Sequence, residues 1–315
     1  MIDKHKYTVD VIVPTYNAAK YLDGLLGSIE DCSANSINSV YFVDSSSSDG
    51  TAELIRQRGF ENVTEIEASD FDHGGTRGGI AKASRGDIVV FLTQDALLAD
   101  EFSIEKLVSV FEDPKIGAAY GRQLPYEWTN RFGEFLRKFN YPDESYVRAY
   151  SDKDKFGIKV AFLSNSFAAY RREYMDEIGW FKNNLILGED AYAGAKLLKL
   201  GYKIAYVADA VVYHSHSYTI LQEFKRYFDI GVFHRMEYWL IEEFGKPEGE
   251  GLRYIKEELR FLIKKNDYLL IVVSFFRNIF KYLGYKLGIN YHRLPDWLIK
   301  RISMHHRWWN KFSGH

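Results

Sequence analysis

Acidic and histidine side chains at the ends of predicted strands are the positions at which this chain could carry out chemistry. Asp44 ends one apolar stretch, and Asp95 closely follows another. A carboxylate at a strand end can accept a hydrogen bond from the N3–H of a pyrimidine, and a buried one needs a partner such as a divalent cation. His214 and His216 follow a third stretch, and either could bind that cation or a phosphate.

Glu189 and Asp190 are adjacent carboxylates at the start of a predicted helix. A helix N-terminus stabilises negative charge, so their position does not by itself require a function. The functional alternative is that one of them acts as a general base, which removes a proton from an acceptor hydroxyl.

The segment FDHGGTRGG at 71–79 surrounds Arg77 with glycines. It predicts a loop whose backbone can approach a ligand closely while the guanidinium binds a phosphate, and a plain flexible loop is the alternative. The segment is neither a Walker A motif nor GxGxxG. Pro14, Thr15 and Asn17 follow the first predicted strand, where they could contact a nucleotide base or ribose, or simply form a turn.

An alternation of strand and helix patterns over the first 120 residues must position these side chains. Strands are predicted at 8–17, 40–44, 62–68 and 87–96, and helices at 18–30, 51–58, 80–86 and 104–111. Near-continuous apolar strands between helices predict an α/β fold with a mostly parallel sheet covered on both faces. Ligands bind at the carboxyl ends of the strands in such sheets, which is where the polar clusters lie.

The pattern is less regular beyond residue 116. Strands are predicted at 117–125 and 203–217, a helix at 190–200, and a loop, strand and helix within 157–179, while 130–154 has no clear period. From residue 221 the chain is mostly helical and basic. We therefore expect a first domain at 1–220 and a helical extension at 221–315.

Composition and charge narrow the class of protein. Hydrophobic residues make up 46% and charged residues 27%, which excludes a disordered or fibrous chain. The single cysteine, Cys32, excludes an internal disulfide and a cysteine-based zinc site, and it fits a reducing compartment.

The last part of the chain carries most of the positive charge. Residues 251–315 contain 13 Lys and Arg against 4 Asp and Glu, so this aromatic segment is expected to face an anionic phospholipid surface or an acidic partner, unless it is a solvated helical face. Its apolar run at 268–283 is interrupted by Arg277 and Lys281, which predicts an amphipathic or buried helix and no membrane span. No nucleic-acid-binding motif is present, so no nucleic acid partner is expected.

Taken together, the motifs resemble one known family. VIVPTYN, VDSSSSDGT, HGGTRGG, a strand ending at Asp95 and GED occur in the order and spacing of a family 2 glycosyltransferase with the nucleotide-diphospho-sugar-binding (GT-A) fold. LTQDALLAD, YGRQLP, FNYPDES, GIKVAFLSNSFAAYRR, GEDAYAG and HSHSYT resemble the bacterial rhamnosyltransferase subgroup. That subgroup uses dTDP-L-rhamnose to build cell-surface polysaccharide.

The resemblance implies a role for each matching residue. Asp190 is the implied catalytic base with Glu189 in support, and Asp95, with His214 or His216, is the implied ligand of Mg²⁺ or Mn²⁺. The implied nucleotide-sugar contacts are Pro14, Thr15, Asn17, Asp44, Ser46, Arg77, Thr93, Gln94 and Arg226. The implied acceptor contacts are Ser164, Asn165 and Arg171.

The chain departs from the broad family at two positions. Thr93 stands where the first aspartate of the DxD motif usually lies, a departure that the rhamnosyltransferase subgroup shares. Gly78 stands where the family often has asparagine.

The resemblance implies an inverting transferase that moves L-rhamnose from dTDP-L-rhamnose to a lipid-diphosphate-linked saccharide. It further implies a cytoplasmic enzyme whose C-terminal region lies on the inner face of the cell membrane, or pairs with a second copy as a homodimer. The alternatives are a UDP-hexose donor, a catalytically silent GT-A scaffold, and a nucleotidyltransferase. A nucleotidyltransferase would carry a glycine-rich basic loop directly after the first strand, where this chain has TYNAAKYLDG.

Overall fold

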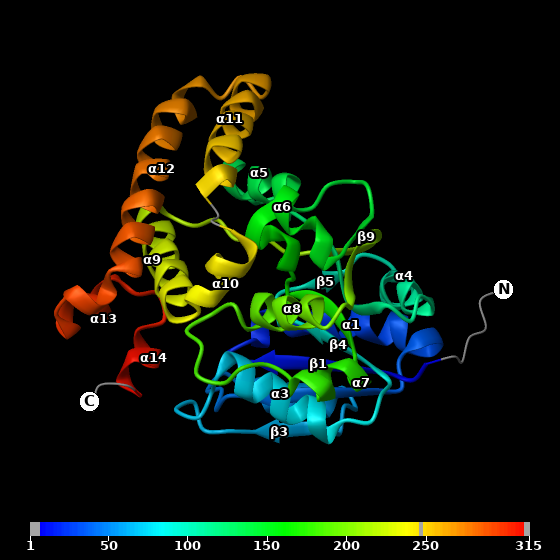
Figure 1. The fold of residues 1–315 in the computed structure, drawn as a ribbon. Helices are drawn as coiled ribbons and strands as arrows, with labels where there is room; N and C mark the ends of the chain where they lie inside the picture. Colours follow the sequence, from blue (N-terminus) through cyan, green and yellow to red (C-terminus); the bar gives the residue numbers. More distant parts are fainter. Residues whose placement is uncertain (1–6, 246–247, 312–315) are drawn as a thin grey trace.

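The computed structural model describes residues 7–245 and 248–311, and these form one central sheet with helices around it (Figure 1). The strands are β1 Val9–Thr15, β2 Ser39–Asp44, β3 Val63–Glu65, β4 Ile88–Leu92, β5 Leu97–Leu98, β6 Ile116–Leu124, β7 Tyr146–Arg148, β8 Phe167–Arg171 and β9 Lys203–Tyr213. Their order across the sheet is β3–β2–β1–β4–β8–β6–β9–β5, and β7 pairs with β9.

Most neighbouring strands in the first half of the sheet are parallel, as predicted. β3, β2, β1 and β4 pair in parallel, and β6 pairs in parallel with β9. β8 lies antiparallel between β4 and β6, so the two parallel groups point in the same direction. The carboxyl ends of β1, β2, β4 and β9 therefore meet at one edge of the sheet.

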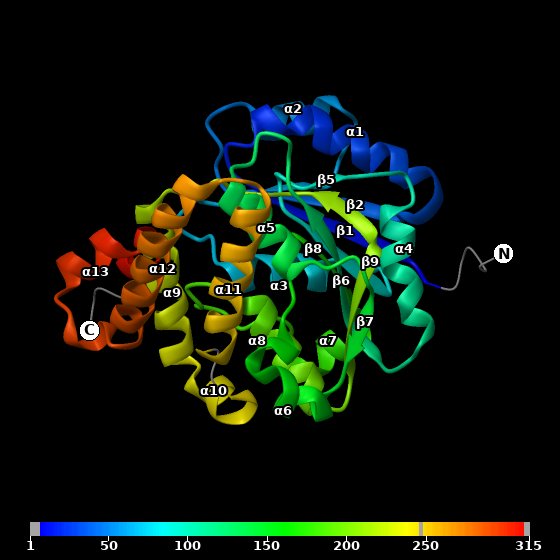
Figure 2. The same cartoon turned by 90° about the horizontal axis from the view of Figure 1, so that it is seen from above.

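Helices cover both faces of the sheet (Figure 2). One layer contains α1 Ala19–Ser36, α2 Thr51–Gln57 and α4 Ser103–Ser109, and the other contains α3 His73–Ala83, α7 Arg172–Ile178 and α8 Glu189–Lys199. In β1, Val11 and Val13 pack into the core under α1, whereas Ile12 between them packs into the core that contains α3 and α8. The alternation of side chains along a strand explains why every central residue of β1 is apolar.

The prediction of a loop at 71–79 is wrong, because the chain forms helix α3 from His73 onward. Asp72 caps this helix by accepting a hydrogen bond from the N–H of Gly75. A Cβ on Gly74 would lie 2.1 Å from the carbonyl oxygen of Lys182, and one on Gly78 would lie 3.5 Å from Cβ of Trp180. Gly74 therefore serves close packing of the helix, whereas a Cβ at Gly78 would make only an ordinary contact and one at Gly79 would meet no atom within 4 Å.

The aperiodic segment contains several short elements, namely α5 Arg131–Asn140, β7 and α6 Lys153–Phe156. Short 3₁₀ helices occur at Val110–Glu112, Tyr150–Asp152, Gly157–Ala161 and Tyr291–Arg293. β7 and α6 have three and four residues, which is too short to show a hydrophobic period. Helix α5 has ten residues and an apolar face, so here the sequence prediction missed a helix.

From Ile220 onward the described chain is helical, in accord with the predicted extension (Figure 1). The helices are α9 Ile220–Met236, α10 Tyr238–Phe244, α11 Glu248–Lys264, α12 Tyr268–Ile289, α13 Asp296–Ile302 and α14 His306–Asn310. Thr219 and Gln222 form a capping box at the start of α9. Phe228 and Val232 of α9 belong to the same core as Ile12, so one hydrophobic core runs across the predicted boundary.

Helix α12 is amphipathic with its polar side inward. Arg277 and Lys281 are buried and both lie against the Glu223 carboxylate of α9, at 2.7 and 3.5 Å. Gly284 and Gly288 let the two helices touch, because a Cβ at either position would clash with an α9 carbonyl oxygen. Among the residues that the structure describes, no helix is both long and apolar enough to cross a membrane.

Candidate active site

A cavity of about 890 Å³ lies at the carboxyl edge of the sheet. One wall comes from the segments after β1, β2 and β4 and from the start of α3. The opposite wall comes from residues 304–311, near the C-terminus. The lining residues discussed below are Pro14, Thr15, Tyr16, Ser45, Phe71, Asp72, His73, Arg77, Thr93, Gln94, Asp95, Ile186, Met304, His305, Arg307 and Lys311.

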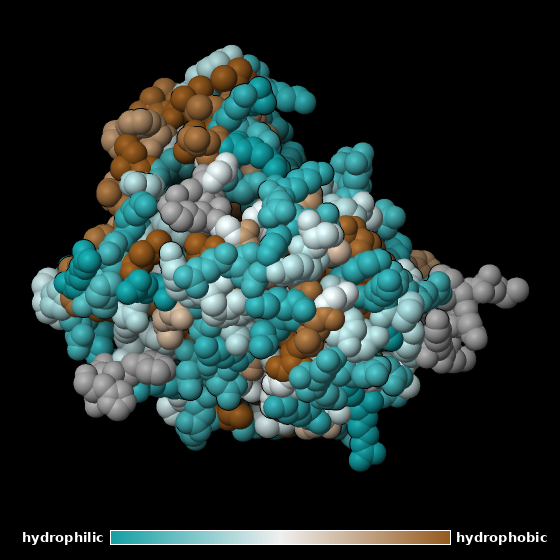
Figure 3. Space-filling view, in the orientation of Figure 1, coloured by the Kyte–Doolittle hydropathy of each residue, from teal (hydrophilic) through white to brown (hydrophobic). Residues whose placement is uncertain are grey.

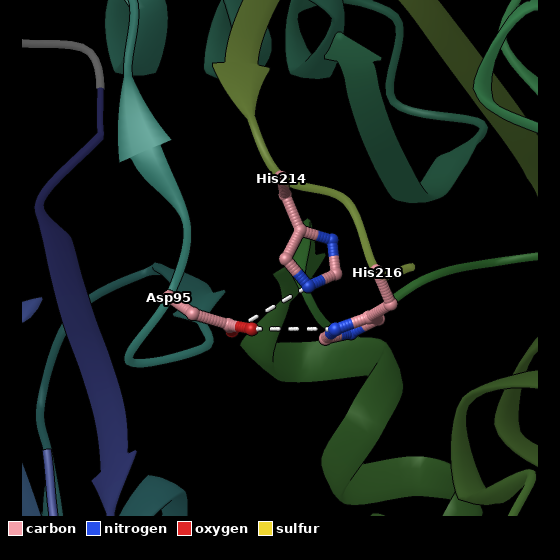
Figure 4. A group of neighbouring side chains, drawn as sticks. All are labelled: Asp95, His214 and His216. Atoms are coloured by element: carbon pink, nitrogen blue, oxygen red, sulfur yellow. Dashed lines mark ion pairs between the residues drawn. The ribbon is translucent and has the colours of Figure 1, made fainter. Parts of the chain in front are cut away.

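Asp95, His214 and His216 converge at this edge (Figure 4). The Asp95 carboxylate lies 3.4 Å from Nε2 of His214 and 3.8 Å from Nδ1 of His216. One potential ligand atom from each residue lies within 4.8 Å of the others. Asp95 follows β4, whereas both histidines follow β9, so the sheet topology brings them together.

The protonation states of these three residues suit metal binding. Burial favours the neutral form of Asp95, but the neighbouring His214 and His216 together outweigh it and hold the pKa of Asp95 well below its usual value. Burial, and after it the neighbouring His214, lower the pKa of His216 to about 4, and burial also lowers the pKa of His214. An ionised carboxylate and two neutral imidazoles are the forms that bind a cation.

The hydrogen bonds of Gln123 explain how His214 is oriented. Oε1 of Gln123 accepts a hydrogen bond from the guanidinium of Arg137, which can only donate. The contact of 2.8 Å between this oxygen and Nδ1 of His214 therefore needs the proton on Nδ1. Nε2 of His214 then presents a lone pair towards the Asp95 carboxylate. Both groups are hydrogen-bond acceptors, so a cation between them would satisfy both. This donor set fits a divalent cation.

Asp44 organises the ends of β1 and β2. Its carboxylate accepts hydrogen bonds from the hydroxyls of Thr15 and Ser47, at 2.9 and 2.6 Å, and from the N–H of Ser47. The N–H of Asn17 donates to Oγ of Ser47, and Oδ1 of Asn17 accepts from the N–H of Ser48. The predicted nucleotide residues thus lie together, with Asp44 and Asn17 supporting the loops that form the cavity wall.

Two further predicted residues line the cavity, and one does not. The side-chain amide of Gln94 pairs with both backbone groups of Tyr16, which joins the segments after β4 and β1. Thr93 also lines the cavity, as expected for a nucleotide contact. Ser46 donates its hydroxyl to the carbonyl of Ile66, and its neighbour Ser45 lines the cavity instead.

Glu189 and Asp190 begin α8 and belong to a largely buried polar network. Oε1 of Glu189 lies 3.3 Å from the guanidinium of Arg77 and accepts a hydrogen bond from the amide of Asn165. The backbone N–H of Asn165 donates to Asp190 at 3.2 Å. Asn165 therefore positions the acidic pair, and its amide oxygen is used by the Tyr170 hydroxyl.

The two neighbouring carboxylates have different acidities. Burial, together with the charge of Glu189, raises the pKa of Asp190 to about 7. Burial favours the neutral form of Glu189, but Arg77, His73 and the hydrogen bond from Asn165 together outweigh it and hold the pKa of Glu189 below its usual value. Glu189 is thus the permanently ionised partner, whereas Asp190 is a base whose pKa lies near neutrality.

The structure corrects the prediction that Arg171 contacts the acceptor. Arg171 ends β8 and pairs in register with Ile88, at the start of β4, so it lies at the opposite edge of the sheet from Asp95. Its buried guanidinium donates to the carbonyls of Phe111 and Ile116. The sequence did not show that β8 runs antiparallel, which reverses the edge at which its last residue lies.

The predicted roles of two further residues, Arg226 in donor binding and Ser164 in acceptor binding, stay predictions, and the structure shows their surroundings. Arg226 of α9 is exposed and forms no ion pair within the described part of the chain, and its charge acts on His214 and His305. Ser164 accepts a hydrogen bond from the amide of Gln123, beside the acidic pair. Gln123 lies in the YGRQLP motif, but the motif did not indicate that its side chain orients His214, and Arg137 lies in no recognisable motif.

Comparisons with known proteins agree with this geometry. The family model "Glycosyl transferase family 2" matches residues 10–179. O-antigen chain rhamnosyltransferase RfbN of Salmonella typhimurium is 42% identical over 306 residues, 97% of both chains. O-antigen chain rhamnosyltransferase WbaN of Salmonella anatum is 41% identical over 304 residues, 96% of both chains.

A solved structure shows the same fold. It is the mannosyltransferase PcManGT of Pyrobaculum calidifontis, in complex with GDP-Man and Mn²⁺, with a TM-score of 0.64 and 17% identity over 90% of this chain and 88% of that one. Fold and site together define a glycosyltransferase with the GT-A fold, which confirms the expected fold class. The chain belongs to glycosyl transferase family 2.

Proposed function

We propose that this enzyme transfers L-rhamnose from dTDP-L-rhamnose to a hydroxyl of a lipid-diphosphate-linked saccharide during O-antigen synthesis. The observation that carries the proposal is the 41–42% identity, over nearly the whole chain, to two O-antigen rhamnosyltransferases. The convergence of Asp95, His214 and His216 at one sheet edge, with the Asp190 network at α8, supports it.

The chemical step is a single displacement with inversion. Asp190 removes the proton from the acceptor hydroxyl, and that oxygen forms a bond to the anomeric carbon of rhamnose. The bond between this carbon and the diphosphate oxygen breaks on the opposite side, and its electron pair leaves with dTDP. The raised pKa of Asp190, about 7, suits a group that must accept a proton at neutral pH.

Asp95, His214 and His216 would hold Mg²⁺ or Mn²⁺, with phosphate oxygens and water completing the shell. Such an ion supplies neutralisation of the charge that develops on the departing diphosphate. Gln123 keeps His214 in the orientation that this requires. Arg226 has no ion-pair partner among the described residues, and it would add positive charge near His214 and His216.

A donor panel tests this function. The purified enzyme is incubated with dTDP-L-rhamnose, dTDP-glucose, UDP-glucose, UDP-N-acetylglucosamine or GDP-mannose, with Mg²⁺ or Mn²⁺, and released nucleotide is measured. We expect release from dTDP-L-rhamnose, increased by a membrane extract that contains the lipid-linked acceptor. If a UDP-hexose is turned over in preference to dTDP-L-rhamnose, the proposed donor is wrong and the UDP-hexose is the donor. If no donor is turned over, the result favours the alternative of a catalytically silent GT-A scaffold.

We also propose that helix α12 binds peripherally to the cytoplasmic face of the membrane, where lipid-linked acceptors are made available. Leu269 is 87% exposed, and Val272, Phe275 and Phe276 are at least half exposed, so this helix turns apolar side chains outward. Figure 3 shows hydrophobic side chains gathered over α12. A patch of this kind marks an interaction site.

The charges around the patch favour a lipid surface over a second copy of the chain. Lys264 precedes α12 and Arg293 follows it, and both are exposed without an ion pair in the described structure. Trp297, which is 68% exposed, adds an aromatic side chain suited to the headgroup region. Apolar side chains flanked by lysine and arginine fit an anionic bilayer surface.

A further inference from the structure

The C-terminal segment 304–311 lies across the cavity from the sheet edge. Met304, His305, Arg307 and Lys311 line the cavity from one side, and the segments after β1, β2 and β4 line it from the other. These two walls are nearly the full chain apart in sequence. Residues 304–311 therefore complete a cavity whose other lining residues, apart from Ile186, come from the first hundred residues.

This segment is anchored to the body of the protein. The buried carboxylate of Asp229 in α9 accepts hydrogen bonds from the hydroxyl of Ser303 and from the N–H groups of Met304 and His305, at 2.7, 2.9 and 3.1 Å. The His305 ring packs against the ring of His73, with centroids 5.1 Å apart. A segment fixed at its start by three hydrogen bonds and a ring contact forms a defined wall.

The cavity side of the segment is cationic. Residues 304–311 have the sequence MHHRWWNK and contain no carboxylate. Arg307 is exposed, and its guanidinium lies over the Tyr16 ring, 5.5 Å from the centroid and 3.4 Å from the hydroxyl. Lys311 donates to the carbonyl of Phe71. Neither cation forms an ion pair with a carboxylate in the described ranges. Of the two acidic lining residues, Asp72 accepts from the N–H groups of Gly75 and Asn184, and Asp95 faces the two histidines.

The position of Arg307 indicates which part of a ligand it meets. Tyr16 is hydrogen-bonded through its backbone to Gln94, and Gln94 is the neighbour of Asp95. Arg307 therefore faces the part of the cavity next to the cation-binding group. A guanidinium beside a cation site, with no carboxylate of its own, suits a phosphate oxygen as its partner.

We propose that residues 304–311 form the outer wall of the donor site and that Arg307 binds the diphosphate of the nucleotide sugar. This inference rests on the proposed function, since it requires a nucleoside-diphosphate donor. Arg307 binds the diphosphate beside Asp95, His214 and His216. Lys311 extends the same positive surface towards Phe71.

Calorimetric titration of dTDP in the presence of Mg²⁺ tests the inference on the full chain. Arg307→Ala is compared with Arg301→Ala, which removes an exposed arginine of α13 that does not line the cavity. Loss of a charge-assisted hydrogen bond should weaken dTDP binding about 10- to 100-fold in the Arg307 variant. Arg301→Ala should bind like the wild type, and Arg307→Lys should recover part of the affinity.

The outcomes separate this inference from the proposed donor. If the wild type binds dTDP and Arg307→Ala binds equally well, or if Arg301→Ala loses as much affinity, the role of Arg307 is overturned while the function stands. If the wild type binds UDP or GDP but not dTDP, the proposed donor is wrong. The same variants are then compared with the nucleotide that binds, and that comparison decides whether Arg307 binds its diphosphate. If no nucleoside diphosphate binds, both proposals fall.

Discussion

At the scale of single residues, the site works by giving neighbouring groups different protonation states. Glu189 keeps its charge because Arg77 lies 3.3 Å away, and Asp190 is pushed towards neutrality by burial and by that charge. At the other end of the site, the proton on Nδ1 of His214 is fixed by Gln123. A few hydrogen bonds therefore decide which groups accept protons and which bind cations.

Asp190→Asn should abolish transfer while leaving donor binding intact. The amide cannot accept the hydroxyl proton, and loss of a general base typically costs about 10²–10⁴-fold in rate. The rate of transfer is measured from the release of dTDP, and the affinity for dTDP is measured separately by calorimetry. A parallel loss of affinity would mean that Asp190 acts in binding and would contradict its assignment as the base.

The activity of the wild type should rise with pH through about 7 and then level off, because only ionised Asp190 accepts a proton. Glu189→Gln removes the negative charge that helps to raise the pKa of Asp190, so the midpoint should move to lower pH. The measurement is the pH dependence of the transfer rate for both proteins. A midpoint that stays in place, or moves to higher pH, would refute the coupling between the two carboxylates.

At the scale of elements, packing decides conformations that local sequence disfavours. Helix α3 contains four glycines and nevertheless forms, because it packs against the segment around Trp180 and Lys182. Helix α12 turns Arg277 and Lys281 inward because Glu223 of α9 compensates their charge. Each of these elements is stabilised by its neighbours more than by its own residues.

Gly74→Ala should destabilise the fold, whereas Gly79→Ala in the same helix should not. A Cβ at position 74 would meet the Lys182 carbonyl, but one at position 79 has no atom within 4 Å. We expect a loss of roughly 1–3 kcal/mol in the free energy of unfolding for the first variant. For the second we expect a gain of up to about 1 kcal/mol, since alanine favours a helix over glycine. Urea denaturation of both variants decides this, and equal effects would contradict the packing account.

At the scale of the whole molecule, the cavity and the apolar face of α12 lie on one connected body. Helix α9 connects these two parts. Its Asp229 anchors the segment beside the cavity, and its Glu223 pairs with Arg277 on the inward side of α12. A membrane-bound acceptor would therefore meet the site from the side on which the C-terminal helices gather (Figure 1). If α12 binds a membrane as proposed, this arrangement would link the position of the enzyme on that surface to access to its site.

Phe275→Asp should reduce binding to vesicles that contain anionic lipid, because a charge in the apolar face opposes insertion. Leu54→Asp, on α2 and away from α12, is the matched control. Co-flotation is measured with anionic and with neutral vesicles, at low and high salt. Binding should need anionic lipid and fall partly with salt. Equal flotation of both variants, or dimerisation through this face detected by light scattering, would contradict the membrane assignment.

The sequence alone determined the features that depend on local pattern. Apolar strands ending in polar residues predicted the mostly parallel sheet and placed Asp44 and Asp95 at its carboxyl edge, and GED predicted the acidic pair at a helix start. Period and turn chemistry are properties of neighbouring residues, so they can be recognised without a structure. The same reasoning failed at 71–79, where the chain forms helix α3 in place of the predicted loop and close packing against Lys182 explains Gly74.

Only the tertiary structure decided which distant residues meet. Arg307 contacts Tyr16 across 291 positions, and Gln123 fixes His214 across 91. The direction of β8, which removes Arg171 from the site, follows from its pairing with β4 and β6. Such contacts depend on how elements pack, and no local period or propensity records them, because the residues involved become neighbours only when the chain folds.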